Sequence, residues 1–261
     1  MNLVFASGFL LPQRVGSIDY FNGVRALVEG KGHLPLFHVV PALGTSEDRA
    51  GSLAAATRTL FPAGPIHIIA HSMGGLDSRY LIDRNPDLAA RIVSLTMLST
   101  PNEGSPLADL LAGGRPGLLS FWRRGAYDAI SAAVGSLGID IGALADLRKD
   151  GAEAAPKVAT THPQIRYRSY AASGRADGRK TSLLLFPGYE YILGHADGGP
   201  NDGAVAVASA RYGEFKEIWP CDHLDMVGHD LDDPMLRPRK FDHLAEYDKI
   251  ITMLQAEHPG T

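Results

Sequence analysis

Apolar residues follow two different spacings along this chain. In some segments they stand side by side in short runs, and in others they recur at the three- and four-residue spacing of a helix. The segments that predict strands cover residues 2–6, 36–40, 66–70, 92–98, 165–171 and 215–219, and those at 66–70 and 92–98 are typical of buried strands. The helical segments cover residues 19–29, 45–60, 76–83 and 241–256. This alternation predicts an α/β fold with a mostly parallel, doubly wound sheet.

Composition places the chain in the globular class and excludes some partners. Of its 261 residues, 45% are hydrophobic and 21% are charged, which is enough apolar material for a large core. The net charge of −4 and the lack of a Lys/Arg run argue against a nucleic-acid partner. The single cysteine, Cys221, excludes an intramolecular disulfide.

The sequence predicts neither a membrane span nor an export signal. No apolar run reaches the length of about 18 residues that a transmembrane helix needs. Residues 1–12 are apolar, but they lack the basic start and the small-residue cleavage site of a signal peptide. We therefore expect a cytoplasmic location, with a secreted mature form as the alternative.

The strongest chemical signal follows directly after the run at residues 66–70. A serine stands there among small residues, in the segment Ala70-His71-Ser72-Met73-Gly74-Gly75. In a nucleophile elbow, usually written Gly-x-Ser-x-Gly, the serine occupies a strained turn between a strand and a helix. The residues two before and two after it approach each other closely, and Ala70 here takes the first glycine position. The flanking strand and helix favour Ser72 as a nucleophile over a serine in an ordinary turn.

A serine hydroxyl needs a base to take its proton and an acid to orient that base. Behind such an elbow, the acid and then the histidine follow in chain order. His223 fits as the base, because it lies in a loop directly after a predicted strand. Asp202, in the turn-forming segment Asn201-Asp202-Gly203, fits as the acid. The alternatives are one other acid and two other bases: Asp197, His195 and His229.

Two backbone N–H groups are expected to stabilise the negative charge that develops on the substrate oxygen. One belongs to Met73, directly after the nucleophile. The other belongs to Phe9, because Gly8 allows the loop after the first strand to turn its backbone toward the site. A main-chain donor leaves the side chain free, so Phe9 and Leu10 are also predicted to line an acyl pocket.

Residues 106–157 interrupt the alternation of strands and helices within what we predict to be a single domain, 1–261. They are rich in glycine and alanine, with helical pieces at 107–111, 127–134 and 141–149. An insertion after a core strand predicts a helical lid or cap over the active site, either mobile or fixed. Four apolar residues there are predicted to face an acyl chain or a lipid surface: Leu118, Leu119, Phe121 and Trp122.

These segments together resemble the bacterial true lipases of the Pseudomonas/Burkholderia type, which have the α/β-hydrolase fold. The matching segments are 4–9, 19–23, 44–47, the elbow, 99–109, 144–147 with 150–152, 201–203 and 222–225. In that family Asn-Asp-Gly and Asp-His-Leu-Asp are the acid and base loops, which implies Asp202 and His223 again. Ser7-Gly8 departs from the family's His-Gly, so the hydrogen bonds of the oxyanion loop are expected to differ. The signal peptide and disulfide of many secreted members are also missing from this sequence.

The resemblance further implies a structural calcium ion, although the chemistry itself needs no cofactor. Family members bind calcium through an aspartate two residues after the catalytic histidine, a position that Asp225 matches. Asp177 is a candidate for the second acidic ligand. The alternative role of Asp225 is that of a carboxylate that caps its own loop.

The sequence therefore predicts a carboxylic ester hydrolase that works through an acyl-enzyme on Ser72. The apolar insertion favours a lipase or carboxylesterase for medium or long acyl chains, with a lipid or small-molecule ester as substrate and a lipid interface as partner. A polyester or polyhydroxyalkanoate depolymerase and a thioesterase are alternatives with the same triad. A non-catalytic binding protein on a hydrolase scaffold is the alternative from another class.

Overall fold

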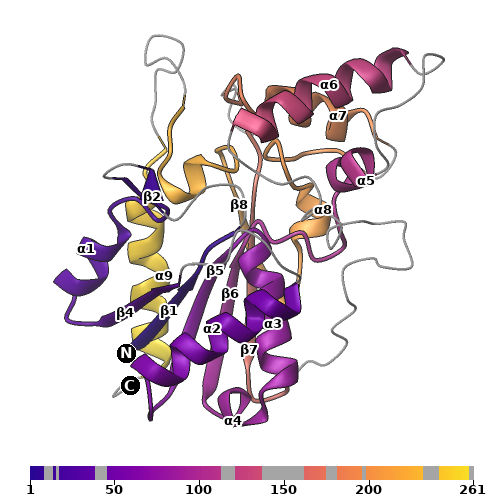
Figure 1. Ribbon diagram of the computed structural model, residues 1–261. Coiled ribbons are helices and arrows are strands. Elements are labelled where there is room, and N and C mark those ends of the chain that lie inside the picture. Colours follow the sequence, from indigo (N-terminus) through magenta and orange to yellow (C-terminus); the bar gives the residue numbers. More distant parts are fainter. Residues whose placement is uncertain are drawn as a thin grey trace.

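A single parallel sheet organises the protein (Figure 1). The computed structural model describes residues 1–8, 14–15, 18–38, 46–112, 121–136, 162–174, 181–195, 198–231 and 241–258. In this part of the chain the sheet has six parallel strands in the order β4, β1, β5, β6, β7, β8. Their bounds are β1 Asn2–Ala6, β4 Leu34–His38, β5 Ile66–His71, β6 Ile92–Leu98, β7 Arg166–Ala172 and β8 Glu214–Trp219. Two further strands, β2 (Arg14–Val15) and β3 (Ile18–Asp19), form an antiparallel pair.

Helices cover both faces of the sheet, as the continuous apolar runs predicted. The described helices are α1 Val24–Gly30, α2 Ser46–Leu60, α3 Met73–Arg84, α4 Pro86–Ala89, α5 Pro106–Ala112, α6 Phe121–Ser136, α7 Phe186–Leu193, α8 Val207–Ala210 and α9 His243–Glu257. A short 3₁₀ helix, η2, covers Asp225–Val227. None of these helices is both long and apolar enough to cross a membrane.

The alternation of side chains along β1 shows how the two faces divide. Leu3 and Phe5 belong to a buried cluster with residues of α1 and α9. Val4 and Ala6 belong to a second buried cluster with residues of α2, α3 and α4. Successive side chains of a strand point to opposite faces, so a strand in the middle of the sheet needs apolar residues at every position. β5, which carries the nucleophile at its end, is buried over its whole length.

All six predicted strands form within two residues of their expected bounds, but the predicted start of the first helix is wrong. That helix was expected from residue 19, and α1 begins only at Val24. Asp19 pairs in β3 instead, and Gly23 adopts a left-handed φ of 73°. Gly23 therefore separates the buried residues Tyr20 and Phe21 from the helix. The helices α4, α7 and α8 and the β2–β3 pair were not predicted, because they are too short to show a clear periodicity.

Three helices gather at one end of the sheet (Figure 1). α5 and α6 lie within the predicted insertion, and both α5 and α6 contact α7. They pack against the first turns of α3 in one apolar cluster, made by Met73, Leu76, Ala108, Leu110, Leu111 and Ile130. These helices therefore cover the elbow helix next to the carboxyl end of β5. Residues 137–157, Leu118 and Leu119 lie outside the described residues, as do the side chains of Phe121 and Trp122.

Candidate active site

Ser72 occupies a strained turn between β5 and α3. The strand ends at His71, the helix begins at Met73, and Ser72 between them has φ 56° and ψ −133°. Non-glycine residues rarely adopt such a conformation, which persists only where the surroundings enforce it. Here the Ser72 amide donates to the Leu98 carbonyl of the next strand at 2.9 Å. The side chain is 5% exposed, so the turn directs it into the protein at the sheet edge.

The glycines after Ser72 allow two other segments to approach the elbow. A Cβ atom on Gly74 would collide with the carbonyl oxygens of Ala6 and Ser7, at the end of β1. A Cβ atom on Gly75 would collide with the Thr100 side chain, in the loop after β6. Gly74 and Gly75 are thus required by close contacts with the end of β1 and with the loop after β6. The N-terminus of α3, with the Met73 amide in its first turn, faces the same region and favours negative charge there.

Asp202 and His223 meet as the sequence predicted. Nδ1 of His223 lies 2.7 Å from Oδ2 of Asp202, and both side chains are fully buried. The second carboxylate oxygen, Oδ1, accepts hydrogen bonds from the amides of Ala204 and Val205 at 2.9 and 2.7 Å. The backbone amide of His223 also donates to the Asp202 carbonyl at 3.0 Å. These contacts fix the orientation of the carboxylate, and the carboxylate in turn orients the imidazole ring.

The acid loop is held from both sides. The Asn201 side chain accepts from the Gly203 amide at 2.9 Å and donates to the Tyr189 carbonyl of α7 at 3.2 Å. On the other side, the Ser105 hydroxyl, in the loop after β6, donates to the Ala204 carbonyl at 2.9 Å. The conformation of the acid loop therefore depends on α7 and on the loop after β6.

The base loop is held by a second aspartate that the sequence analysis did not single out. Oδ1 of Asp222 accepts from the amides of Leu224 and Asp225, and Oδ2 accepts from the Ser182 amide, each at 3.0 Å. The Asp225 carboxylate accepts in return from the Asp222 amide at 3.0 Å. The position of Asp222 directly before a candidate base was the only sequence signal for this role.

His223 lies against the residue that precedes the nucleophile. The rings of His71 and His223 are 4.5 Å apart between centroids. Nε2 of His223 is buried and has no hydrogen-bond partner among the described residues. In hydrolases without bound substrate, the hydrogen bond from nucleophile to base is often loose. The arrangement thus leaves the Nε2 nitrogen available to take a proton.

A tyrosine and a histidine that the sequence analysis left out complete the surroundings of Ser72. The Tyr20 hydroxyl accepts from the Gly8 amide at 3.0 Å and lies 2.7 Å from Nδ1 of His71. Burial lowers the pKa of His71 well below its ordinary value, and the charge of His223 adds to this effect. His71 is therefore neutral at physiological pH.

The alternative candidates take other positions. His229 lies on the base loop and contacts the Tyr20 carbonyl through Nε2 at 2.8 Å, and His195 lies in the turn after α7 beside Tyr191. Among these three histidines of the described part of the chain, it is His223 that hydrogen-bonds to Asp202. The alternative acid Asp197 lies outside the described residues, as do the predicted oxyanion donor Phe9 and the pocket residue Leu10.

The described residues alone do not test the calcium ion that the resemblance implies. No group of three or more His, Cys, Asp or Glu side chains in the described part of the chain could hold a metal ion. Calcium needs six to eight oxygen ligands at once, and one Asp225 oxygen already accepts a loop amide. Asp177, the candidate for the second ligand, lies outside the described residues.

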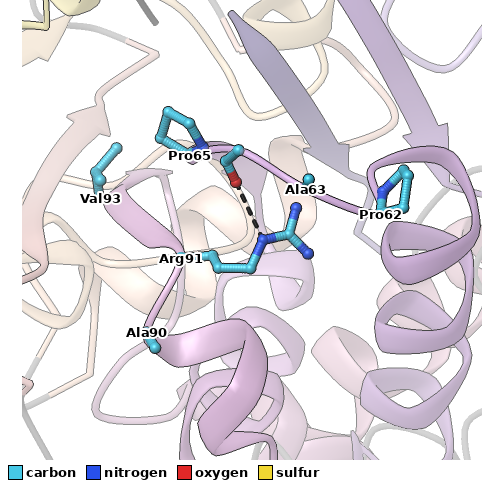
Figure 2. A pocket seen from close by; sticks show the side chains of 7 residues that line it. Pro62, Ala63, Pro65, Ala90, Arg91 and Val93 are labelled. Atoms are coloured by element: carbon cyan, nitrogen blue, oxygen red, sulfur yellow. Dashed lines mark hydrogen bonds between the residues drawn. The ribbon is translucent and has the colours of Figure 1, made fainter.

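A surface hollow at the opposite end of the sheet is separate from this site (Figure 2). It is lined by Pro62, Ala63, Gly64, Pro65, Ala90, Arg91 and Val93. These residues stand at or just before the amino ends of β5 and β6, whereas Ser72 follows the carboxyl end of β5. The Arg91 guanidinium donates to the Gly64 and Phe61 carbonyls, so it holds the loop together at this hollow.

Comparison with known proteins agrees with this fold. A family model described as the alpha/beta hydrolase fold matches residues 44–189, more than half of the chain. The chain therefore belongs to the α/β-hydrolase fold family. Its parallel sheet, strained serine elbow and buried Asp–His pair are the features that this family places at the carboxyl ends of the strands.

Among individual proteins, the chain is similar to lipases. It is 28% identical to triacylglycerol lipase 2 of Saccharomyces cerevisiae over 218 residues, 80% of this chain and 62% of the yeast protein. It is 31% identical to a triacylglycerol lipase of Pseudomonas fragi over 112 residues, 42% of this chain and 37% of that protein. The matched regions thus span less than two thirds of either relative. The crystal structure of Staphylococcus hyicus lipase has the same fold, with a TM-score of 0.72, 18% identity and coverage of 98% and 95% of the two chains.

Proposed function

We propose that this protein is a serine hydrolase that cleaves carboxylic esters, with Ser72 as nucleophile, His223 as base and Asp202 as acid. The observation that carries the proposal is the buried 2.7 Å contact between His223 and Asp202, at the sheet edge where Ser72 is strained. A serine with a purely structural role does not need a strained backbone. A histidine that only fills the core does not need a fully buried carboxylate next to Nδ1 while Nε2 has no hydrogen-bond partner among the described residues. The combination serves proton transfer to and from a serine.

The proposed reaction has two steps. His223 takes the Ser72 proton on Nε2 while the serine oxygen bonds to the ester carbonyl carbon, and the Met73 and Phe9 amides hold the resulting oxyanion. The tetrahedral intermediate expels the alcohol, which takes the proton from His223, and the acyl group stays on Ser72. Water then attacks the acyl-enzyme with His223 again as base, and the acid is released. Asp202 stabilises the imidazolium in both steps.

The proposed substrates are lipid esters with medium or long acyl chains. Both individual relatives are named as triacylglycerol lipases. Within this chain, the apolar helices α5, α6 and α7 gather beside the elbow helix, where an acyl chain bound to Ser72 would need an apolar wall. On the same grounds we propose that the chain is a lipase of the Pseudomonas/Burkholderia type, with α5 and α6 in its lid or cap.

Hydrolysis of p-nitrophenyl esters from acetate to palmitate tests the reaction and its chain-length range. We expect activity that peaks at C8 or longer and that falls about 10⁴–10⁶-fold in Ser72→Ala. Ser52→Ala, in α2, is the matched control and should keep wild-type rates. A peak at C2–C4 would mean that the enzyme is a carboxylesterase for small esters rather than a lipase. Full activity in Ser72→Ala would overturn the role of Ser72.

Covalent labelling separates a catalytic site from a binding module. A fluorophosphonate should modify Ser72 alone, as shown by mass spectrometry of the labelled peptide, because only an activated serine reacts quickly. A folded protein that is labelled but cleaves no p-nitrophenyl ester would point to polyester or thioester substrates. A folded protein that is neither labelled nor active would contradict the proposed enzyme.

A further inference from the structure

The segment Asp19-Tyr20-Phe21-Asn22-Gly23 contributes no residue to the proposed triad, although it contacts the loops around it. Tyr20 is 2% exposed, and its hydroxyl is in contact with two different parts of the site. It accepts the Gly8 amide at 3.0 Å and lies 2.7 Å from Nδ1 of His71. One oxygen atom thus connects the loop after β1 with the residue before the nucleophile.

The direction of these hydrogen bonds follows from the charge states. Burial raises the pKa of the Tyr20 hydroxyl and lowers that of the His71 imidazole, so both groups are neutral. The Gly8 amide can only donate, so the Tyr20 oxygen accepts from it. The hydroxyl can then donate to Nδ1 of His71, 2.7 Å away, which places the proton of neutral His71 on Nε2. In this arrangement the Gly8 amide and the Tyr20 hydroxyl both have partners, whereas Nε2 of His71 has no hydrogen-bond partner among the described residues.

Gly8 has no room for a side chain beside Ser72. A Cβ atom at Gly8 would lie 2.5 Å from Cβ of Ser72 and 2.8 Å from the Tyr20 hydroxyl. The Gly8 backbone therefore lies close to the nucleophile, and the hydrogen bond to Tyr20 holds the Ser7–Gly8 peptide. The next peptide, Gly8–Phe9, carries the Phe9 amide that is the proposed second oxyanion donor. In this chain Ser7-Gly8 stands where the resembled family has His-Gly. The Ser7 hydroxyl donates to the His38 carbonyl at the end of β4.

Tyr20 is also fastened to the base loop. Nε2 of His229 lies 2.8 Å from the Tyr20 carbonyl. Two residues on, the Asn22 amide and side chain donate to the Val227 and Gly228 carbonyls, each at 3.0 Å. The segment therefore joins the base loop, the oxyanion loop and the elbow into one network around Ser72.

From these contacts we infer that Tyr20, together with His71, is a positioning residue for the oxyanion loop. Its hydroxyl holds Gly8 against Ser72 so that the next amide can reach the substrate oxygen. The inference rests on the proposed ester hydrolysis and assigns to the 19–23 segment a role that the triad does not give it. Neither side chain needs to touch the substrate.

Tyr20→Phe removes the hydroxyl and keeps the ring, so it tests the inference directly. We expect kcat to fall about 10–100-fold with KM changed by no more than about twofold, because a misplaced donor weakens the transition state rather than ground-state binding. Inhibition by an alkyl trifluoromethyl ketone, which forms an oxyanion on Ser72, should weaken by the same factor as kcat/KM. Tyr247→Phe makes the same chemical change at another fully buried tyrosine and should leave all three constants unchanged.

Two variants of His71 provide the second test. Asn places its side-chain oxygen near the position of Nδ1 and should retain most of the activity, whereas Leu offers no acceptor and should resemble Tyr20→Phe. Wild-type kcat and ketone inhibition in folded Tyr20→Phe, or equal activities of His71→Asn and His71→Leu, would overturn the positioning role. If the wild type cleaves no ester, the rate of fluorophosphonate labelling of Ser72 replaces kcat in the same comparison. A wild type that is also not labelled would overturn the proposed function, and this inference with it.

Discussion

Nδ1 of His223 and Oδ2 of Asp202 lie 2.7 Å apart, and the other oxygen of this carboxylate accepts two backbone amides. The two amides leave only one way for an amide side chain to replace the carboxylate. In Asp202→Asn, the carbonyl oxygen has to face the Ala204 and Val205 amides, so the side-chain NH₂ group faces Nδ1 of His223. The replacement therefore fixes the histidine proton on Nε2, the nitrogen that has to accept the serine proton.

Asp202→Asn should accordingly lower kcat by about 10⁴-fold without unfolding the protein, as expected for a triad histidine held in the wrong tautomer. Steady-state kinetics with a p-nitrophenyl ester and circular dichroism measure the two parts of this prediction. Asp87→Asn, at a surface aspartate paired with Arg58, is the matched control and should keep full activity. A near-normal kcat in Asp202→Asn would mean that another residue is the acid, and Asp197 would be the first candidate to test.

Gly188 allows α7 to contact the acid loop, because a Cβ atom there would collide with the Gly203 carbonyl. Gly188→Ala should lower the free energy of unfolding by about 1–3 kcal/mol through overpacking, and kcat should fall because the acid loop moves with α7. Gly51→Ala, in α2, is the matched control, since its Cβ atom would meet nothing within 4 Å. It should stabilise the protein by about 0.5–1 kcal/mol. Urea unfolding measures the change in the free energy of unfolding for each variant. Changes of the same sign in Gly188→Ala and Gly51→Ala would contradict the packing argument.

Asp222 is buried and accepts hydrogen bonds from three backbone amides. Asp222→Ala should therefore lower the free energy of unfolding by about 3 kcal/mol, the scale expected for buried donors left unpaired. Asp222→Asn keeps one acceptor oxygen and should show a smaller loss. Urea unfolding measures both values, and an Ala variant as stable as the Asn variant would mean that the carboxylate does not hold the loop.

The role of Asp225 can be separated from calcium binding by thermal unfolding. The Asp225 carboxylate accepts the Asp222 amide, so Asp225→Ala should lower the Tm whether or not calcium is present. If the Asp225 carboxylate only caps its own loop, the Tm of the wild type should be the same in calcium chloride and in EGTA. A calcium-dependent rise in Tm that Asp225→Ala abolishes would instead establish a site completed by other residues, with Asp177 as the first to test.

His67 should make the protein less stable in acid. It is fully buried on β5 beside the Ser94 hydroxyl, and burial, followed by the charges of His258, the N-terminus and Arg168, lowers its pKa to about 4. In the unfolded chain its pKa is near the ordinary 6.5, so the unfolded state takes up a proton first as the pH falls. The stabilisation that depends on neutral His67 is thus fully present above pH 6.5 and is lost progressively as the pH falls to 4. This loss lowers the free energy of unfolding by up to about 3 kcal/mol. His67→Gln should show a shallower decline of unfolding free energy between pH 7 and pH 5, and an equal decline would contradict the assignment.

Local patterns in the sequence predicted the sheet and the elbow, while chain order and the family resemblance pointed to Asp202 and His223, with Asp197, His195 and His229 left as alternatives. Strands 2–6 and 92–98 form at the expected bounds, because segments this rich in apolar residues are stable inside a covered sheet. The elbow is a contiguous motif whose small residues are explained by contacts with β1 and with the loop after β6. His223 follows the carboxyl end of β8, whereas Asp202 lies between α7 and α8 and was chosen for its turn-forming segment and its place in the chain order.

The tertiary structure alone decided which other residues surround Ser72. Tyr20 is 52 positions from the nucleophile, and its segment was predicted to be helical, whereas the left-handed Gly23 places it before the start of α1. His71 precedes the nucleophile, and the chain order excludes it as the base but not as a support for the oxyanion loop. Asp222 and Gly188 matter because they face the Ser182 amide and the Gly203 carbonyl. Such contacts join segments far apart in the chain, and no local pattern encodes them, because their geometry exists only once the sheet and its loops have packed.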